Sequence, residues 1–175
     1  MRRINSIAAA IATLSLAVSA HAQLTTTTDI TPYNIAVRAG VALPFDTALS
    51  NYGNPLIDLG VEYQAGRSLL PGGDTYFSLD YFTKDLTFTG GVFPICINQR
   101  FYINHQNRGR RVYAFAGVGA AVIDIGRSDT VVAARGGVGT DLGDAIFFEL
   151  SATISDKGDN GGRADAVGFS VGYRF

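Results

Sequence analysis

The sequence predicts an all-β protein, specifically an eight-stranded antiparallel up-and-down transmembrane β-barrel. The first observation is a set of eight segments in which apolar residues alternate with small or polar ones, the period of a β-strand. The second is that these segments run to about 9–13 residues, close to the length that a tilted membrane-crossing strand needs. The third is an N-terminal segment typical of exported proteins. No segment carries a convincing apolar stripe at the helical period, so we expect very little helix.

The first 22 residues have the order of a secretory signal peptide. Two arginines precede an apolar run at residues 7–18, and a motif of small residues around a histidine ends at Ala22. An N-terminal membrane anchor is the weaker interpretation, because the run is shorter than the roughly 20 residues that a spanning helix needs. We expect cleavage near Ala22. Residues 23–33 would then form a lead-in, and residues 34–175 an outer-membrane β-barrel domain.

The last nine residues show the alternation most clearly. One face of this strand is uniformly apolar and ends in aromatic residues, while the other face is small or charged. The apolar face consists of Val167, Phe169, Val171, Tyr173 and Phe175, and the other of Gly168, Ser170, Gly172 and Arg174. The eight predicted strands are residues 34–43, 56–65, 75–84, 93–103, 112–124, 131–142, 145–154 and 167–175.

Composition excludes several classes of function. The length of 175 residues fits one domain, and a formal net charge of −1 gives no sign of nucleic-acid binding. The single cysteine, Cys96, cannot form an internal disulfide or a multi-cysteine metal site, and we expect it to pack as a small residue inside the barrel. The chain has two histidines, one of them in the signal segment. We therefore expect no cofactor, no metal ion and no nucleic-acid partner.

Alternation alone does not separate a membrane barrel from a soluble barrel or sandwich, because each has one apolar face. Three features favour lipid on the apolar face. Gly and Ser predominate on the polar face, which suits the crowded interior of an eight-stranded barrel. Aromatic residues lie near strand ends, where membrane barrels have interfacial girdles. The export signal and a final strand that reaches the last residue are the third feature. The aromatic residues are Tyr63, Phe101, Tyr113, Phe148, Tyr173 and Phe175.

The connections predict an orientation. If both termini face the periplasm, alternate connections point outward, and these tend to be the long polar ones in outer-membrane barrels. The predicted outward connections lie near residues 44–55, 85–91, 124–130 and 155–164. The predicted periplasmic ones lie near 66–74, 104–111 and 142–144.

Charged residues on the inferred inward face nearly balance. Unpaired charges in a narrow lumen are costly, so we predict a network of arginines and carboxylates through the interior. The alternative is a set of unrelated surface ion pairs, each contributing about 0–1 kcal/mol. The predicted network consists of Arg38, Asp58, Glu62, Asp80, Arg100, Arg135, Glu149 and Arg174.

Two motifs resemble a known family. The sequences Val112-Tyr-Ala-Phe-Ala-Gly-Val-Gly-Ala120 and Val171-Gly-Tyr-Arg-Phe175 resemble the small outer-membrane β-barrels that include the OmpA transmembrane domain, OmpX and the opacity-type proteins. The resemblance implies a Gram-negative outer-membrane location, with outer-membrane lipid and the barrel-assembly machinery as partners. It also implies that Phe169, Val171, Tyr173 and Phe175 form a C-terminal assembly signal. The group includes adhesins and structural anchors, so the activity and the ligand of the loops stay open.

The favoured function is a structural role or an interaction through the outer loops. We expect side chains to plug the lumen, and we expect no enzymatic activity. Large inward residues such as Tyr102 argue against a general diffusion channel. The first alternative is a lipid A-modifying enzyme, which would need His105, the single histidine after the signal peptide, as its base. We place His105 in a solvated turn instead. The second alternative is a periplasmic lipocalin-like binder of small molecules.

Overall fold

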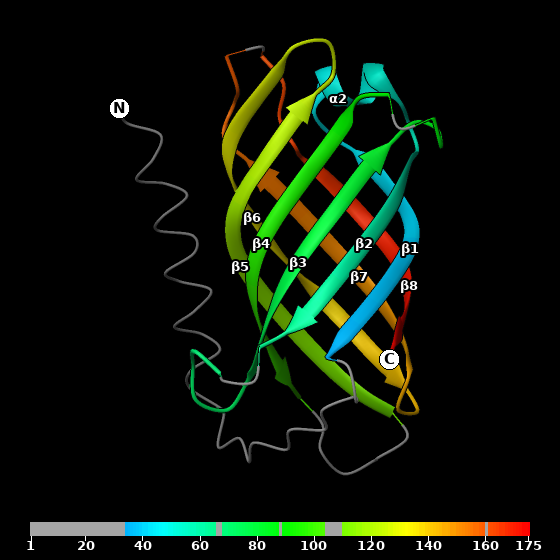
Figure 1. Ribbon diagram of the computed structural model, residues 1–175, viewed down its shortest axis with the longest axis vertical. Helices are drawn as coiled ribbons and strands as arrows, with labels where there is room; N and C mark the ends of the chain where they lie inside the picture. The colour runs from blue at the N-terminus through cyan, green and yellow to red at the C-terminus, as the bar shows by residue number, and fades with distance from the viewer. Residues whose placement is uncertain (1–33, 66–67, 88, 104–109, 160) are drawn as a thin grey trace.

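The chain forms one closed β-barrel. The computed structural model describes residues 34–65, 68–87, 89–103, 110–159 and 161–175. Its eight antiparallel strands pair in the order of the sequence, and the last strand pairs with the first (Figure 1). The predicted fold class is confirmed. The strands are β1 (Ile35–Pro44), β2 (Leu56–Gln64), β3 (Asp74–Thr83), β4 (Gly91–Tyr102), β5 (Arg110–Asp124), β6 (Ser128–Leu142), β7 (Ile146–Ser155) and β8 (Ala166–Arg174).

The strand bounds differ by at most two residues from the predicted ones, except at the start of β6. Both β5 and β6 have 15 residues, and β6 begins at Ser128 rather than at residue 131. Asp124 still pairs with Ser128 at the tip of this hairpin. Ladder hydrogen bonds join backbone groups and do not require apolar side chains, so a polar segment can continue a strand beyond its alternating part.

A short helix, α2 (Thr47–Tyr52), occupies the first connection, for which the sequence predicts only a long loop. The Asp46 carboxylate caps it by accepting hydrogen bonds from the backbone N–H groups of Ala48 and Leu49, at 2.9 and 3.2 Å. Six residues are too few to show the helical period, so the capping aspartate is the one signal that the sequence offers. No helix in the described part of the chain is long and apolar enough to cross a membrane.

The apolar face of the sheet points outward. Val37, Leu79 and Phe169 are 42–49% exposed, whereas Arg38 and Glu149 on the other face are 3% and 1% exposed. A soluble barrel has the opposite arrangement, with the apolar face inside and the charged face in water. The structure therefore resolves the ambiguity of the alternation by placing the polar face in the interior.

Both ends of the described barrel lie at the same rim, because the Phe175 N–H donates to the Ile35 carbonyl at 2.9 Å (Figure 1). We call this rim the terminal end. The opposite rim, which carries α2, is the loop end, and there the connections are residues 45–55, 84–90, 125–127 and 156–165. This grouping of connections agrees with the predicted one. At the terminal end, the turn at 143–145 is tight, and Gly143 adopts a φ of 72° in it.

Candidate functional site

The interior of the barrel is filled by inward side chains in three layers. A charged layer occupies the middle, an aromatic and arginine-rich layer lies toward the terminal end, and an apolar layer closes the loop end. The layers follow from the closed topology, which turns every second residue of each strand toward the axis. The interior is therefore the part of the molecule in which the predicted site residues can meet.

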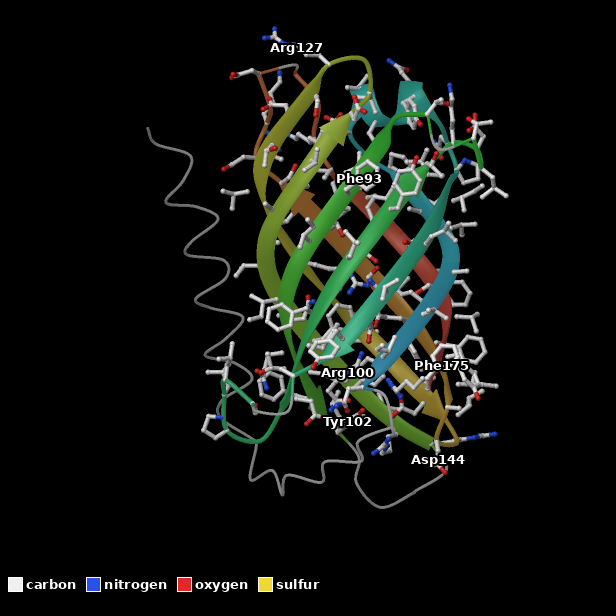
Figure 2. The ribbon with its side chains drawn as sticks, viewed as in Figure 1. Phe93, Arg100, Tyr102, Arg127, Asp144 and Phe175 are labelled. Atoms are coloured by element: carbon white, nitrogen blue, oxygen red, sulfur yellow. The ribbon has the colours of Figure 1, made fainter. Side chains whose placement is uncertain are left out.

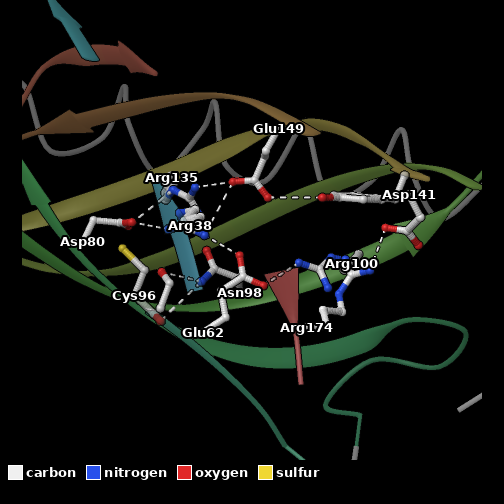
Figure 3. A network of polar contacts seen from close by, with 12 residues as sticks. Arg38, Glu62, Asp80, Cys96, Asn98, Arg100, Arg135, Asp141, Glu149 and Arg174 are labelled. Carbon is white, nitrogen blue, oxygen red and sulfur yellow. Dashed lines mark hydrogen bonds and ion pairs between the residues drawn. The ribbon is translucent and has the colours of Figure 1, made fainter. Parts of the chain in front are cut away.

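Arg38 lies at the centre of the charged layer. Its guanidinium donates to Glu62 on β2 and to Asp80 on β3, and its Nη1 lies 3.6 Å from Glu149 Oε1 on β7 (Figure 3). The fork of a guanidinium can serve several carboxylates at once, which a lysine cannot do as well. One arginine thus joins strands on opposite sides of the barrel.

Arg135 makes a second bridge across the same layer. It donates to Glu149, and its Nε lies 3.6 Å from Asp80 Oδ2 (Figure 3). Glu149 and Asp80 each face both Arg135 and Arg38, so the two arginines and two acids form a continuous network. All four side chains are at most 2% exposed.

Arg100 connects the charged layer to the aromatic layer. Its Nη2 donates to Glu62 Oε2 at 2.8 Å. Its guanidinium carbon also lies 4.4 Å from the centre of the Tyr76 ring and 4.6 Å from that of Tyr113, within the range of cation–π contacts. The arginine therefore has a carboxylate on one side and aromatic faces on the other.

A separate ion-pair group lies nearest the terminal end. Arg174 donates to Asp141 Oδ1 at 2.7 Å, and Arg111 lies 3.2 Å from Asp141 Oδ2. Arg174 also lies 4.4 Å from the centre of the Phe147 ring. This group joins β5, β6 and β8 at the rim where the chain ends.

The loop end of the interior is apolar, which the sequence analysis did not predict. Leu49 of α2 is fully buried there, together with Leu56 and Phe82, and Ala164 from the last connection covers the same cluster. The interior is thus closed by a helix side chain and not only by strand residues. The inward apolar residues in this layer are Ala42, Leu56, Phe82, Val92, Ala121, Ile123, Val131, Ala133 and Ala166.

Glycines make room for the large inward side chains. A Cβ added to Gly60 would lie 2.6 Å from Arg38 Nε, and one added to Gly139 or Gly172 would overlap the ring of Tyr113 or Phe147. In each case the glycine stands directly opposite the large residue on the neighbouring strand. This pairing accounts for five of the 21 glycines in the chain. The pairs are Arg38–Gly60, Asn98–Gly117, Tyr113–Gly139, Phe115–Gly137 and Phe147–Gly172.

The eight residues of the predicted charge network all lie inside the barrel and are buried. Six of them meet in the network around Arg38, Arg135 and Arg100. Arg174 does not join these six and instead pairs with Asp141. Asp58 lies in the same layer, but its Oδ1 has no hydrogen-bond partner among the described residues.

Asp141 and Arg111 are site residues that the sequence analysis missed. Asp141 falls within the predicted strand at residues 131–142 but was left out of the predicted network, and it lies on the inward face of β6. Its spacing from Arg135 is even, and that parity could have placed the two side chains on one face.

One predicted girdle residue is wrongly placed by the sequence analysis. Tyr113 was expected near the lipid interface, but its ring is fully buried in the interior, and its hydroxyl donates to Glu149 Oε2 at 3.4 Å. The alternation is weak in this Gly- and Ala-rich strand, so aromatic content near a strand end misled the assignment. Tyr63, Tyr173 and Phe175 do lie on the outer wall, and each is 46–52% exposed.

The four residues of the predicted assembly signal lie on the outer wall of β8 or directly after it. Phe169, Val171, Tyr173 and Phe175 are 42–49% exposed, and the rings of Tyr173 and Phe175 meet edge to face at 5.0 Å. At the loop end, the rings of Tyr81 and Phe93 stack on the outside at 4.4 Å. Figure 2 shows Phe93 toward the loop end and Phe175 toward the terminal end.

Two residues that could carry out chemistry, His105 and Cys96, are not among the residues of the predicted charge network. His105 is outside the described residues, and so are the signal segment and lead-in, residues 1–33. Cys96 is buried in the interior, where it faces Gly119 on β5. In the ranges that the structure describes, no group of three or more His, Cys, Asp or Glu residues is arranged to hold a metal ion.

Comparison with known proteins bears on the fold. No protein family and no curated protein matches the sequence. Among solved structures, Ail, the attachment invasion locus protein of Yersinia pestis, aligns with a TM-score of 0.52 at 15% identity, over 81% of this chain and 96% of that one. Neisserial surface protein A (NspA) aligns with a TM-score of 0.51 at 10% identity, over 81% and 96% of the two chains. The N-terminal β-barrel domain of OprF from Pseudomonas aeruginosa gives 0.48 at 17% identity, over 80% and 97%.

Proposed function

Because the chain has the fold of the small eight-stranded outer-membrane β-barrels, we propose that it is an integral outer-membrane protein with a structural or surface-interaction role. The barrel would act as a closed scaffold, and the loop end would face outward as an interaction surface. The termini would face the periplasm after removal of residues 1–22. The ligand of the loop end is left open by this proposal.

The polarity of the two faces is the observation that supports this proposal most directly. Large apolar side chains cover the outside of every strand, whereas buried arginines and carboxylates occupy the middle of the interior. In water such a wall would expose far more contiguous apolar surface than soluble monomers tolerate. In a bilayer the same wall is solvated by acyl chains, and the closed ladder leaves no unpaired strand edge in the lipid.

The packing of the interior supports a closed lumen rather than a diffusion channel. The charged network fills the middle, and Leu49 with its apolar neighbours covers the loop end. A cavity near Arg100 and Arg174 has a volume of about 10 Å³, roughly what one water molecule needs. We therefore expect purified protein in a planar lipid bilayer to give no stable open channel. A steady conductance in most reconstituted membranes would refute the closed lumen.

The loop end is suited to binding because its connections are tied to one another. The Phe45 N–H donates to the Asp165 carbonyl at 3.1 Å, which joins the first and last connections. The Tyr52 hydroxyl of α2 donates to the Thr89 carbonyl at 3.0 Å, which joins the first connection to the second one at this end. A surface ordered before binding loses less conformational entropy on contact with a partner.

Cell fractionation combined with gel mobility tests the membrane proposal. We expect the protein in the outer-membrane fraction, with a band that migrates differently before and after boiling, because a closed barrel resists detergent in the cold. A soluble periplasmic protein without a mobility shift would overturn the proposal. It would favour the lipocalin-like alternative.

A pair of epitope insertions tests the orientation. The turns at residues 125–127 and 143–145 lie at opposite ends of the barrel, and Gly126 and Gly143 have open space around them. We expect an epitope after Gly126 to be labelled on intact cells, and one after Gly143 only after the outer membrane is permeabilised. The reverse pattern would show that the barrel has the opposite orientation. Labelling of both epitopes on intact cells would contradict a barrel that spans the membrane.

A further inference from the structure

Residues 68–73, in the connection between β2 and β3, pack against the outside of the barrel wall. Its last residue, Gly73, is so close to β4 that an added Cβ would lie 2.6 Å from the Arg100 carbonyl oxygen and 2.9 Å from the Phe101 ring. The backbone N–H of Leu69 donates to the side chain of Thr75 on β3 at 2.8 Å. In Figure 1 residues 68–73 lie to the side of the lower end of the barrel.

A closed set of hydrogen bonds holds the connection in this position. Thr75 and Gln99 are outward-facing polar residues on a wall that is mostly apolar, yet they are only 3% and 8% exposed. The Thr75 hydroxyl donates to Gln99 Oε1 at 2.7 Å, and Gln99 Nε2 donates to the Ser68 hydroxyl at 2.8 Å. Water could satisfy these groups without any such arrangement. Where lipid replaces water, each unsatisfied polar group is costly. Hydrogen bonds among Ser68, Thr75 and Gln99 remove that cost for the side-chain groups that they join.

The same segment presents two adjacent leucines to the surroundings. Leu69 is 68% exposed and Leu70 is 49% exposed, and Pro71 after them is exposed as well. Turns between strands are normally polar, so consecutive exposed leucines in a turn need an explanation. The segment contacts β4 through the hydrogen bond between Ser68 and Gln99, and Gly73 after it lies beside Phe101 at the terminal end of the apolar wall. The leucines thus extend the surface that the proposed function places in lipid.

We propose that residues 68–71 are a membrane-docking element, in which Leu69 and Leu70 insert among the lipid acyl chains of the leaflet at the terminal end. This inference rests on the proposed membrane location of the barrel. Ser68, Thr75 and Gln99 hold the segment against the wall, and the Leu69 N–H and the Leu70 carbonyl are hydrogen-bonded within this set, which lowers the cost of placing the leucines in the bilayer. The element would anchor one side of the barrel rim at the depth of the membrane interface.

Tryptophan fluorescence can test this docking directly, because the chain has no tryptophan of its own. The test variant is Leu70→Trp, refolded in phosphatidylcholine vesicles with and without brominated acyl chains, which quench nearby indoles. Phe169→Trp on the outer wall is the positive control. Asp144→Trp is the matched negative control, because it lies in the tight turn at the same end of the barrel (Figure 2). The boiling-dependent mobility shift verifies that each variant has folded.

We expect the brominated lipid to reduce emission of the Leu70→Trp variant at least half as much as it reduces that of Phe169→Trp. Emission of Asp144→Trp should change by less than about a tenth. If Leu70→Trp behaves like Asp144→Trp while Phe169→Trp is quenched, the docking element is refuted and the membrane barrel stands. If Phe169→Trp is not quenched, the proposed function itself fails. An unquenched, blue-shifted Leu70→Trp emission that depends on protein concentration would assign the leucines to a second copy of the chain and overturn the lipid proposal.

Discussion

Replacing Glu62 with alanine removes a carboxylate that two arginines share. Glu62 accepts from Arg38 and, at 2.8 Å, from Arg100, and all three side chains are at most 4% exposed. Arg38 keeps contacts with Asp80 and Glu149 after the change, but Arg100 loses the carboxylate that it binds. A buried guanidinium would then face the rings of Tyr76 and Tyr113 without a compensating negative charge.

The expected loss of stability follows from leaving the Arg100 guanidinium without its carboxylate. Removing one partner of a buried ion pair costs about 3–5 kcal/mol, because the other charge stays buried and uncompensated. With a denaturant dependence of about 2 kcal/mol per molar in urea, the unfolding midpoint should fall by roughly 2 M. The assay is the fraction of the cold-resistant gel band as a function of urea, measured in detergent micelles or vesicles.

Two further variants sharpen the test of the Glu62 prediction. Asp144→Ala removes an exposed carboxylate from the tight turn and should change the stability by no more than about 0.5 kcal/mol. The double variant Glu62→Ala with Arg100→Met removes both partners, and it should recover part of the lost stability, because no charge is left unpaired on that side. An unchanged midpoint for Glu62→Ala would refute the argument that the interior network stabilises the barrel.

Three other substitutions probe the remaining layers and the loop end. Gly172→Ala should destabilise the barrel by about 1–3 kcal/mol, because the new methyl group overlaps the Phe147 ring, and adding Phe147→Leu should relieve part of that cost in a double-mutant cycle of urea midpoints. Leu49→Ala should cost about 2–5 kcal/mol by leaving a cavity under α2, and a midpoint within about 0.5 kcal/mol of wild type would contradict the closing role of this side chain. Burial raises the pKa of Asp165 above its ordinary value, against the lowering effect of the hydrogen bond from the Ser155 N–H. An acid with a raised pKa in the folded state adds stability at low pH that is lost as the pH rises through that value. The stability of the wild type relative to Asp165→Asn should therefore fall as the pH rises above about 4, the ordinary pKa of an aspartate, and identical pH profiles would count against the prediction.

The strands could be predicted from sequence because their signal is local. In β8 the alternation of Phe169, Ser170 and Val171 is visible without knowledge of any neighbour, and the structure has the same residues out and in. Where the local signal is weak, the prediction failed. In β5, glycine and alanine occupy so many positions that Tyr113 was placed on the wrong side of the wall.

Partners across the barrel could not be predicted in the same way. Arg38 stands directly opposite Gly60, but its charge is met by Glu62 and Asp80, one of which lies two strands away. Long side chains reach along and across the barrel, so the partner depends on strand register and on closure as well as on order in the chain. Asp141, which accepts a hydrogen bond from Arg174 two strands away, was left out of the predicted network.

The sequence by itself determined that this chain forms eight long strands with one apolar and one polar face, because a period of two depends only on the backbone of each strand. Alternation alone left open which side the polar face occupies, since it also fits a soluble barrel. The Gly- and Ser-rich polar face and the aromatic residues near strand ends favoured the interior, and the structure confirms that the polar face lies there. Tertiary structure alone decided that Leu49 closes the loop end, and that the Leu69–Leu70 segment lies along the outer wall. Those positions depend on contacts between distant segments, which exist only after the sheet has closed on itself.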